Sequence, residues 1–179
     1  MTVVVENLNF LFALGTVCLQ LFAGILLILY FSKKEIAGKH LLRTYGLHVA
    51  LLLSVITTLS TLLYSEILGF EPCSLCWLQR IFLYPQVILL GIALIKKERL
   101  IADYCIGLSV PGALIALYQH YLQMGGSSFV KCPAISDGAD CAKRIVFEFG
   151  FITFPLMSFT VFVALIILML FVRKAYIRT

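Results

Sequence analysis

Long stretches without a charged side chain constrain the fold of this chain more than any other feature. Four such runs consist mostly of apolar residues, and they cover residues 8–31, 44–65, 104–130 and 149–172. A helix needs roughly 20 consecutive apolar residues to cross the hydrocarbon core of a membrane, so each run has enough length. Only 13% of the residues are charged, whereas soluble domains carry about 25%. The sequence therefore predicts an all-α integral membrane protein.

A fifth apolar run, residues 81–95, is too short to span a membrane by itself. It becomes long enough when it is extended back to Ser74, because the long side chain of Arg80 can place its charge at the membrane surface. We expect five spanning helices within a single membrane domain, residues 1–179, at about 9–31, 46–68, 75–95, 100–122 and 151–172.

The basic residues predict how these helices are oriented. Ten of the 14 lysines and arginines lie in the first loop, the third loop and the C-terminal tail. With five spans these segments share one side of the membrane, and the positive-inside rule makes that side cytoplasmic. The N-terminus and the loop of residues 123–150 are then expected outside, with the C-terminus inside. The net charge of +5 thus reflects membrane topology and implies no nucleic-acid partner.

Two cysteines three residues apart, Cys73 and Cys76, stand at the expected outer end of the third span. Residues at this spacing share a face of a helix, which brings two sulfurs within the range that a disulfide needs. Pro72 suits a helix start, and the first turn of a helix favours a thiolate. Arg80 adds a permanent positive charge one turn beyond Cys76. This pattern predicts a reactive dithiol that makes and breaks a disulfide at a membrane surface.

A second pair of cysteines, Cys132 and Cys141, lies in the expected outer loop. Outside the cytoplasm thiols tend to be oxidised, so we expect this pair to form a disulfide. Beyond the loop pair, Ile145, Phe149 and Ile152 follow helical spacing, which favours a short segment that lies on the membrane surface.

Two other interpretations of the four cysteines expected at the outer surface have less support. Zinc could bind four thiolates, but eight residues between Cys132 and Cys141 fit a zinc site poorly, and we expect no metal. Two structural disulfides are possible, yet a disulfide that closes so short a loop as Cys73 to Cys76 constrains the unfolded chain little. Two dithiol pairs on one side of the membrane instead favour an electron relay. The relay would carry electrons from a soluble thiol protein to an electron acceptor in the lipid.

His120 stands at the outer end of the fourth span, which a short turn joins to the span of Arg80. The sequence leaves two interpretations of this side chain open. It could anchor the helix at the membrane surface, or it could donate a hydrogen bond to a bound ligand.

Three motifs resemble the DsbB family of disulfide bond formation proteins, the bacterial membrane thiol–quinone oxidoreductases. The sequence CSLCWLQR of residues 73–80 is similar to the family's C-x-L-C-x-x-x-R, and YQH of residues 118–120 resembles its aromatic–acid/amide–His pattern. The stretch from Asp140 to Gly150 resembles the family's segment around the second loop cysteine. The resemblance covers about 45–172 and implies a four-helix transmembrane bundle, to which this chain adds one N-terminal transmembrane helix.

The resemblance also implies a role for each cysteine of the relay. Cys132 would be attacked by the reduced thiol of a DsbA-like, thioredoxin-fold thiol oxidase. Cys141 would then pass the electrons to Cys73, and Cys76 would engage a quinone, either ubiquinone or menaquinone. The same resemblance implies quinone binding by two further residues: Arg80 would stabilise the thiolate and polarise a quinone oxygen, and His120 would line the pocket.

The sequence thus favours a thiol:quinone oxidoreductase of the bacterial cytoplasmic membrane, with its active site on the extracytoplasmic side. Two alternatives stay open. The chain could carry electrons outward as a thiol reductant, because direction depends on redox potentials. It could also be a non-enzymatic membrane subunit with structural disulfides.

Overall fold

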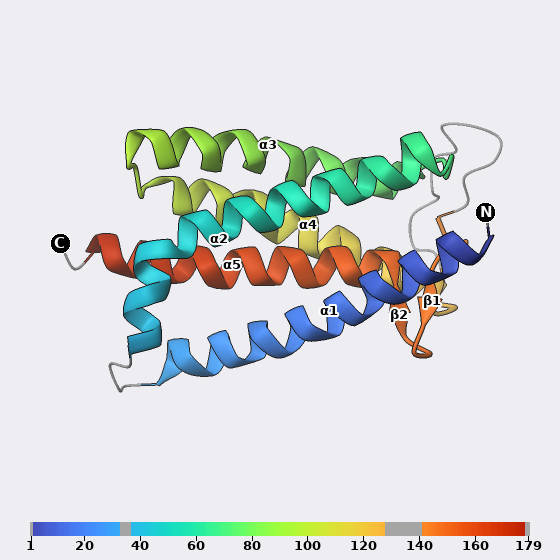
Figure 1. The fold of residues 1–179 in the computed structure, drawn as a ribbon, viewed down its shortest axis with the longest axis horizontal. Helices are drawn as coiled ribbons and strands as arrows, with labels where there is room; N and C mark the ends of the chain where they lie inside the picture. The colour runs from blue at the N-terminus through green and yellow to red at the C-terminus, as the bar shows by residue number, and fades with distance from the viewer. Residues whose placement is uncertain (1, 33–36, 128–140, 178–179) are drawn as a thin grey trace.

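Five long helices form where the sequence has its apolar runs. The computed structural model describes residues 2–32, 37–127 and 141–177, and Figure 1 shows the helices lying side by side. Their bounds are α1 Thr2–Phe31, α2 Ala37–Leu62, α3 Ser74–Lys96, α4 Ile101–Gln123 and α5 Phe154–Ile177. Each contains a segment long and apolar enough to cross a membrane. The prediction of an all-α membrane protein with five spans is therefore confirmed, and the N-outside orientation stays a prediction.

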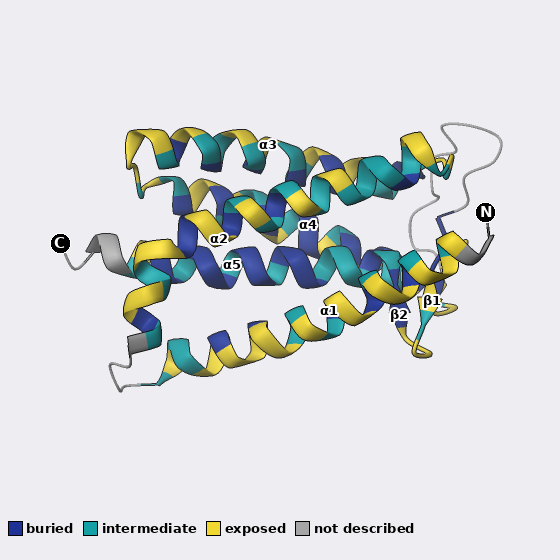
Figure 2. Cartoon of the chain, viewed as in Figure 1, coloured by how far each residue is buried: buried dark blue, intermediate teal, exposed yellow. Residues whose placement is uncertain are grey.

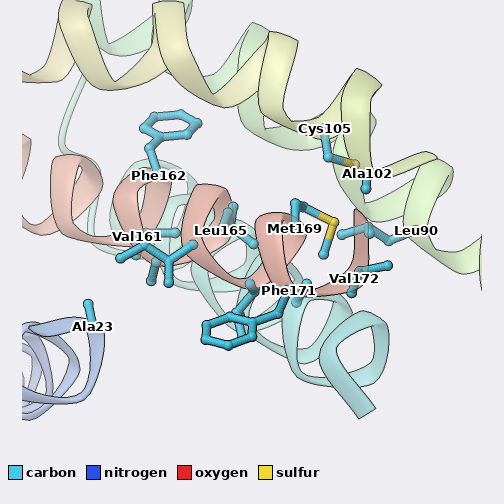
Figure 3. Close-up of a cluster of buried hydrophobic side chains, with 14 of the residues drawn as sticks. Ala23, Leu90, Ala102, Cys105, Val161, Phe162, Leu165, Met169, Phe171 and Val172 are labelled. Atoms are coloured by element: carbon cyan, nitrogen blue, oxygen red, sulfur yellow. The ribbon is translucent and has the colours of Figure 1, made fainter. Parts of the chain in front are cut away.

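The last helix, α5, forms the centre of the bundle. It contacts α1, α2 and α4, while α3 packs against α2 and α4. Figure 2 shows α5 mostly buried, whereas the other helices keep exposed residues on their outer faces. In Figure 3, side chains such as Phe162 and Met169 project from α5 toward its neighbours, and Cys105 of α4 lies beside Met169. A helix that is apolar on all sides belongs in the centre of such a bundle, and the outer faces suit lipid.

The C-terminal end of the second span departs from a regular α-helix. The helix α2 continues directly into a π-helical turn, η1, at Leu63–Ile67. A π turn changes the hydrogen-bond pattern of the backbone and is frequent at functional sites. The π turn also carries Tyr64, a buried residue whose hydroxyl donates to Asn9 Oδ1 of α1. The N-terminal helix is therefore tied to the end of the bundle where η1 lies.

The segment that follows Cys141 is a β-hairpin and not a helical segment. Strand β1, Phe147–Glu148, pairs antiparallel with β2, Ile152–Thr153. The turn between them places Phe149 at a φ of 53° and Gly150 at a φ of 78°. Left-handed backbone is easy for glycine and incompatible with a continuing helix. The short helical segment predicted from the spacing of Ile145, Phe149 and Ile152 is therefore wrong, because Gly150 supports a turn.

Close packing between α4 and α5 depends on Gly112. A Cβ atom at this position would lie 2.5 Å from Cζ of Phe162, which is buried. We expect Gly112→Ala to lower the stability of the bundle by about 1–3 kcal/mol, because the phenyl ring must shift within a packed core. Thermal unfolding in detergent micelles measures the effect.

Gly107 on the same helix provides the matched control. A Cβ atom there meets nothing within 4 Å, so Gly107→Ala should be neutral or slightly stabilising through the higher helix propensity of alanine. Equal unfolding midpoints for the two variants would contradict the proposed role of the Gly112–Phe162 contact.

Candidate active site

The two cysteines of the C-x-x-C motif lie at the start of α3. Cys73 is the N-cap residue, with an extended backbone at φ −69° and ψ 171°, and Cys76 lies in the first turn. Pro72 therefore precedes the cap instead of occupying the first turn. Both cysteines are free thiols, and their sulfur atoms lie 3.0 Å apart. The predicted proximity of the two sulfurs is thus present in the structure.

Cys73 is the buried member of the pair, with 6% of its surface exposed. The hydrogen bond between its thiol and Cys76, together with burial, raises the pKa of Cys73 above its ordinary value. Both effects favour the protonated form of Cys73, whose thiol can then donate toward the sulfur of Cys76. This arrangement leaves Cys76 as the sulfur that is stabilised as a nucleophile.

A buried glutamine of α4 completes the surroundings of the dithiol. The Nε2 atom of Gln119 lies 3.1 Å from Sγ of Cys73 and 3.2 Å from Sγ of Cys76. Its Oε1 atom accepts a hydrogen bond of 2.6 Å from Nε2 of Gln79, which is also buried. The sequence analysis assigned no role to either glutamine. The sequence did contain a signal for them, namely amide side chains within apolar helices. A buried amide requires hydrogen-bond partners, so such residues indicate a polar site inside the bundle.

The positive charge predicted beside the dithiol is present and anchored. Nη2 of Arg80 donates a hydrogen bond of 2.9 Å to the carbonyl oxygen of Thr61, at the end of α2 that leads into η1. The guanidinium group also lies 5.1 Å from the centre of the Trp77 ring. Only 8% of Arg80 is exposed, so these contacts hold its charge at the site while its stem packs within the bundle.

A cavity of about 440 Å³ opens beside the dithiol. Cys73, Cys76, Arg80 and Gln119 contribute to one part of its wall. Apolar side chains supply much of the remainder, and they include Leu83, Phe154, Pro155, Val161 and Phe162. A cavity with mostly apolar walls and a few polar groups is typical of a site for a small organic ligand.

His120 is placed differently from the other predicted site residues. It does not belong to the described residues that line this cavity. Its Nδ1 atom lies 2.8 Å from Oγ1 of Thr153 in β2, so the histidine connects α4 to the hairpin. A contact between His120 and a bound ligand stays a prediction.

The second loop cysteine lies against the dithiol. Cys141 is 1% exposed and packs in one cluster with Cys73 and Leu122. Its sulfur lies 3.7 Å from Oγ of Ser74, the residue that directly follows Cys73. Cys141 is disulfide-bonded, while its predicted partner Cys132 lies outside the described residues. The fold therefore brings together cysteines that are far apart in the sequence.

Metal binding has no support in the described part of the chain. No group of three or more His, Cys, Asp or Glu side chains is placed to hold a metal ion there. Because Cys132 is outside that part, the expected absence of a metal at the four cysteines stays a prediction.

Comparison with known proteins identifies the family of this chain. The model of the family "Disulfide bond formation protein DsbB" matches residues 42–172, which leaves α1 outside the match. "Probable disulfide formation protein C 1" of Bacillus anthracis is 39% identical over 137 residues, which are 76% of this chain and 98% of that protein. No solved structure matches the chain.

Two further relatives carry similar names. "SPbeta prophage-derived disulfide bond formation protein B" of Bacillus subtilis is 47% identical over 106 residues, 59% of this chain and 70% of that protein. "Probable disulfide formation protein" of Chlamydia trachomatis is 41% identical over 138 residues, 76% of this chain and 98% of that protein. The chain therefore belongs to the DsbB family and is a multi-pass membrane protein that generates disulfide bonds.

Proposed function

We propose that this protein re-oxidises a soluble, DsbA-like thiol oxidase and transfers the electrons to a membrane quinone. The observation that supports this most is the placement of the dithiol. Cys73 and Cys76 lie in the wall of an apolar cavity, at the end of a helix long enough to span a membrane. A lipid-soluble electron acceptor can reach such a position from the bilayer.

The residues of the cavity fit a quinone. A quinone ring is flat and apolar, and its two carbonyl oxygens accept hydrogen bonds without donating any. The cavity offers apolar walls for the ring and the guanidinium group of Arg80 as a strong donor for an oxygen. Quinone, when bound, supplies the capacity to accept two electrons and two protons.

The inner pair, Cys73 and Cys76, can give up as many electrons and protons as a quinone accepts. Cys76 is the sulfur poised as nucleophile, and Cys73 holds the proton of the pair. When the two thiols form one S–S bond, they release two electrons and two protons, which convert quinone to quinol. The disulfide that results is then ready to accept electrons from the loop cysteines by thiol–disulfide exchange.

The loop cysteines connect this pair to the soluble partner. Cys141 is buried beside Cys73 and Ser74, so electrons that reach the loop disulfide arrive next to the inner pair. In the proposed relay the partner's reduced thiol attacks Cys132, and Cys141 passes the electrons to Cys73. We place this exchange on the extracytoplasmic side of the bacterial cytoplasmic membrane, where the positive-inside rule puts the loop.

Quinone reduction by the purified full chain in detergent tests the proposal. A reduced thioredoxin-fold oxidase serves as donor, with a ubiquinone or a menaquinone analogue as acceptor, and absorbance reports quinol formation. We expect one quinol for each donor dithiol that is oxidised. No turnover with either analogue, in a folded sample with a competent donor, would overturn the proposal. Faster electron flow from a quinol analogue to the oxidised partner, in a parallel assay, would instead establish the outward reductant.

A further inference from the structure

We propose that Gln119 is a catalytic residue that stabilises the thiolate of the inner pair, and that Gln79 is the positioning residue that fixes the direction of its amide. The proposal deepens the proposed function, because it assigns the group that holds Cys73 and Cys76 ready for oxidation. It concerns the dithiol alone and can be tested without quinone or partner protein.

The amide nitrogen of Gln119 is shared between the two sulfurs. Nε2 carries two hydrogens, and it lies 3.1 Å from Sγ of Cys73 and 3.2 Å from Sγ of Cys76. The amide oxygen is farther from the nucleophile, at 3.7 Å from Sγ of Cys76. The Cys76 thiol donates to this oxygen across the longer distance, so the side chain holds its NH₂ donors closer to both sulfurs than its acceptor.

Gln79 determines this direction. Its Nε2 atom donates a hydrogen bond of 2.6 Å to Oε1 of Gln119. If the amide of Gln119 were reversed, its own NH₂ group would face the NH₂ group of Gln79, and its oxygen would face the sulfurs. Both contacts would then be unfavourable, since two donors meet at one end and an acceptor meets a thiolate at the other. One neutral hydrogen bond thus couples the orientation of the Gln119 amide to that of Gln79.

Burial makes these donors effective. Gln79 and Gln119 are both buried, at 7% and 2% exposure, so water competes little for their hydrogen bonds. Hydrogen bonds to an ionised acceptor are stronger than those to a neutral one, so the amide favours the thiolate over the thiol. Arg80 assists by its charge, but its guanidinium group already binds Thr61 O and stacks on Trp77.

Stabilising the thiolate also affects the redox balance of the pair. A disulfide carries no charge for the amide to stabilise, so the donors favour the reduced state over the oxidised one. The Cys73–Cys76 disulfide becomes a stronger oxidant for the same reason. That property suits a disulfide that must accept electrons from the loop cysteines once the partner has reduced them.

The pH dependence of Cys76 alkylation, followed by mass spectrometry of the reduced full chain in detergent, tests the role of Gln119. Gln119→Met keeps the length of the side chain but removes both donors. We expect about tenfold less thiolate in the variant, seen as an alkylation profile that moves up by about one pH unit. The other titratable or charged groups that line this cavity are the same in both proteins: Tyr64, Glu71, Cys73, Arg80, Lys143 and Arg144.

Gln86 offers the matched control on α3. It is fully buried and its amide is paired with Ser109, 3.1 Å away, so it has no part in the dithiol site. Gln86→Met should leave the alkylation profile of Cys76 unchanged. An unchanged profile in Gln119→Met, with the fold intact by circular dichroism, would overturn the role of the amide.

Substitutions of Gln79 test the orientation. Gln79→Met frees the amide of Gln119, and we expect a smaller upward shift than in Gln119→Met. Gln79→Glu supplies an acceptor that attracts the NH₂ group of Gln119 away from the sulfurs, so its shift should exceed that of Gln79→Met. Gln86→Glu controls for a buried carboxyl group on the same helix. Equal profiles for Gln79→Met and Gln79→Glu would contradict the positioning role.

These variants also keep the proposal testable if one of them does not fold. Gln79→Met leaves Gln119 in place, so it can be measured even where Gln119→Met is unstable. The equilibrium of the inner pair with a thiol buffer gives a second measurement, and we expect Gln119→Met to shift it about tenfold toward the disulfide. No shift in a folded variant would count against the proposal. Failure of quinone reduction in the native protein would overturn only the proposed function.

Discussion

Cys76→Ser is expected to abolish quinone reduction while leaving the protein folded. A serine hydroxyl cannot form a bond equivalent to a disulfide, so the pair loses its only route to releasing two electrons. The hydroxyl is also a far weaker acid than a thiol and gives no nucleophile at neutral pH. The fold should persist because Cys76 lines the cavity and is only partly buried. Absorbance of the quinone, with reduced oxidase as donor, measures the effect.

A second free cysteine provides the control for this result. Cys105 is fully buried in α4, packs in the apolar core and does not line the cavity. Cys105→Ala should keep normal turnover, since its thiol takes no part in the relay. Full turnover in Cys76→Ser would remove the proposed mechanism, whatever the behaviour of the control.

Arg80→Ala is expected to raise the quinone concentration needed for half-maximal rate by about tenfold to a hundredfold. Hydrogen bonds from a charged donor contribute about 1.5–3 kcal/mol, which corresponds to that range. Arg80 lines the cavity and its guanidinium group is held by Thr61 O and Trp77, so it is preorganised as a donor. Initial rates over a range of quinone concentrations measure the change.

Loss of the contact with Thr61 O would also lower stability, so binding and folding must be separated. Arg80→Lys keeps the charge but not the planar fork of donors, and we expect a smaller effect on quinone use. Thermal unfolding of each variant reports the structural part. Arg173→Ala is the control, because this half-exposed arginine pairs with Asp103 on the surface, 3.2 Å away, and such pairs contribute little. A quinone dependence identical to the native one in Arg80→Ala would argue against a role in binding.

The membrane fold could be predicted from the sequence, because the hydrocarbon core imposes a length and a composition on every span. The ends of the helices were less predictable. We expected the second span to begin near residue 46, whereas α2 begins at Ala37. Figure 1 shows its first turns crossing the end of the bundle before the helix runs along it. Leucine, lysine and arginine before residue 46 favour a helix, and the apolar run predicts only the part that can cross the lipid.

The surroundings of the dithiol could not be predicted in the same way. The motif of Cys73, Cys76 and Arg80 is local, so spacing along one helix was enough to place its members together. Gln119 approaches the sulfurs from another helix, and Cys141 lies 67 residues from its contact Ser74. Contacts of this kind depend on how whole helices pack, and periodicity along a single segment contains no information about them.

The sequence by itself determined that this chain has the helices to span a membrane and carries two cysteines at a helix start. Both follow from local physical chemistry, namely the partition of apolar side chains into lipid and the favourable dipole at the first turn. Only the tertiary structure decided that Thr61 O of α2 receives Arg80, that Cys141 is buried beside Cys73, and that Gln119, bonded to Gln79, brings donors to the sulfurs. The physical reason is that buried polar groups must find partners, and which partners are in reach is settled when the helices pack.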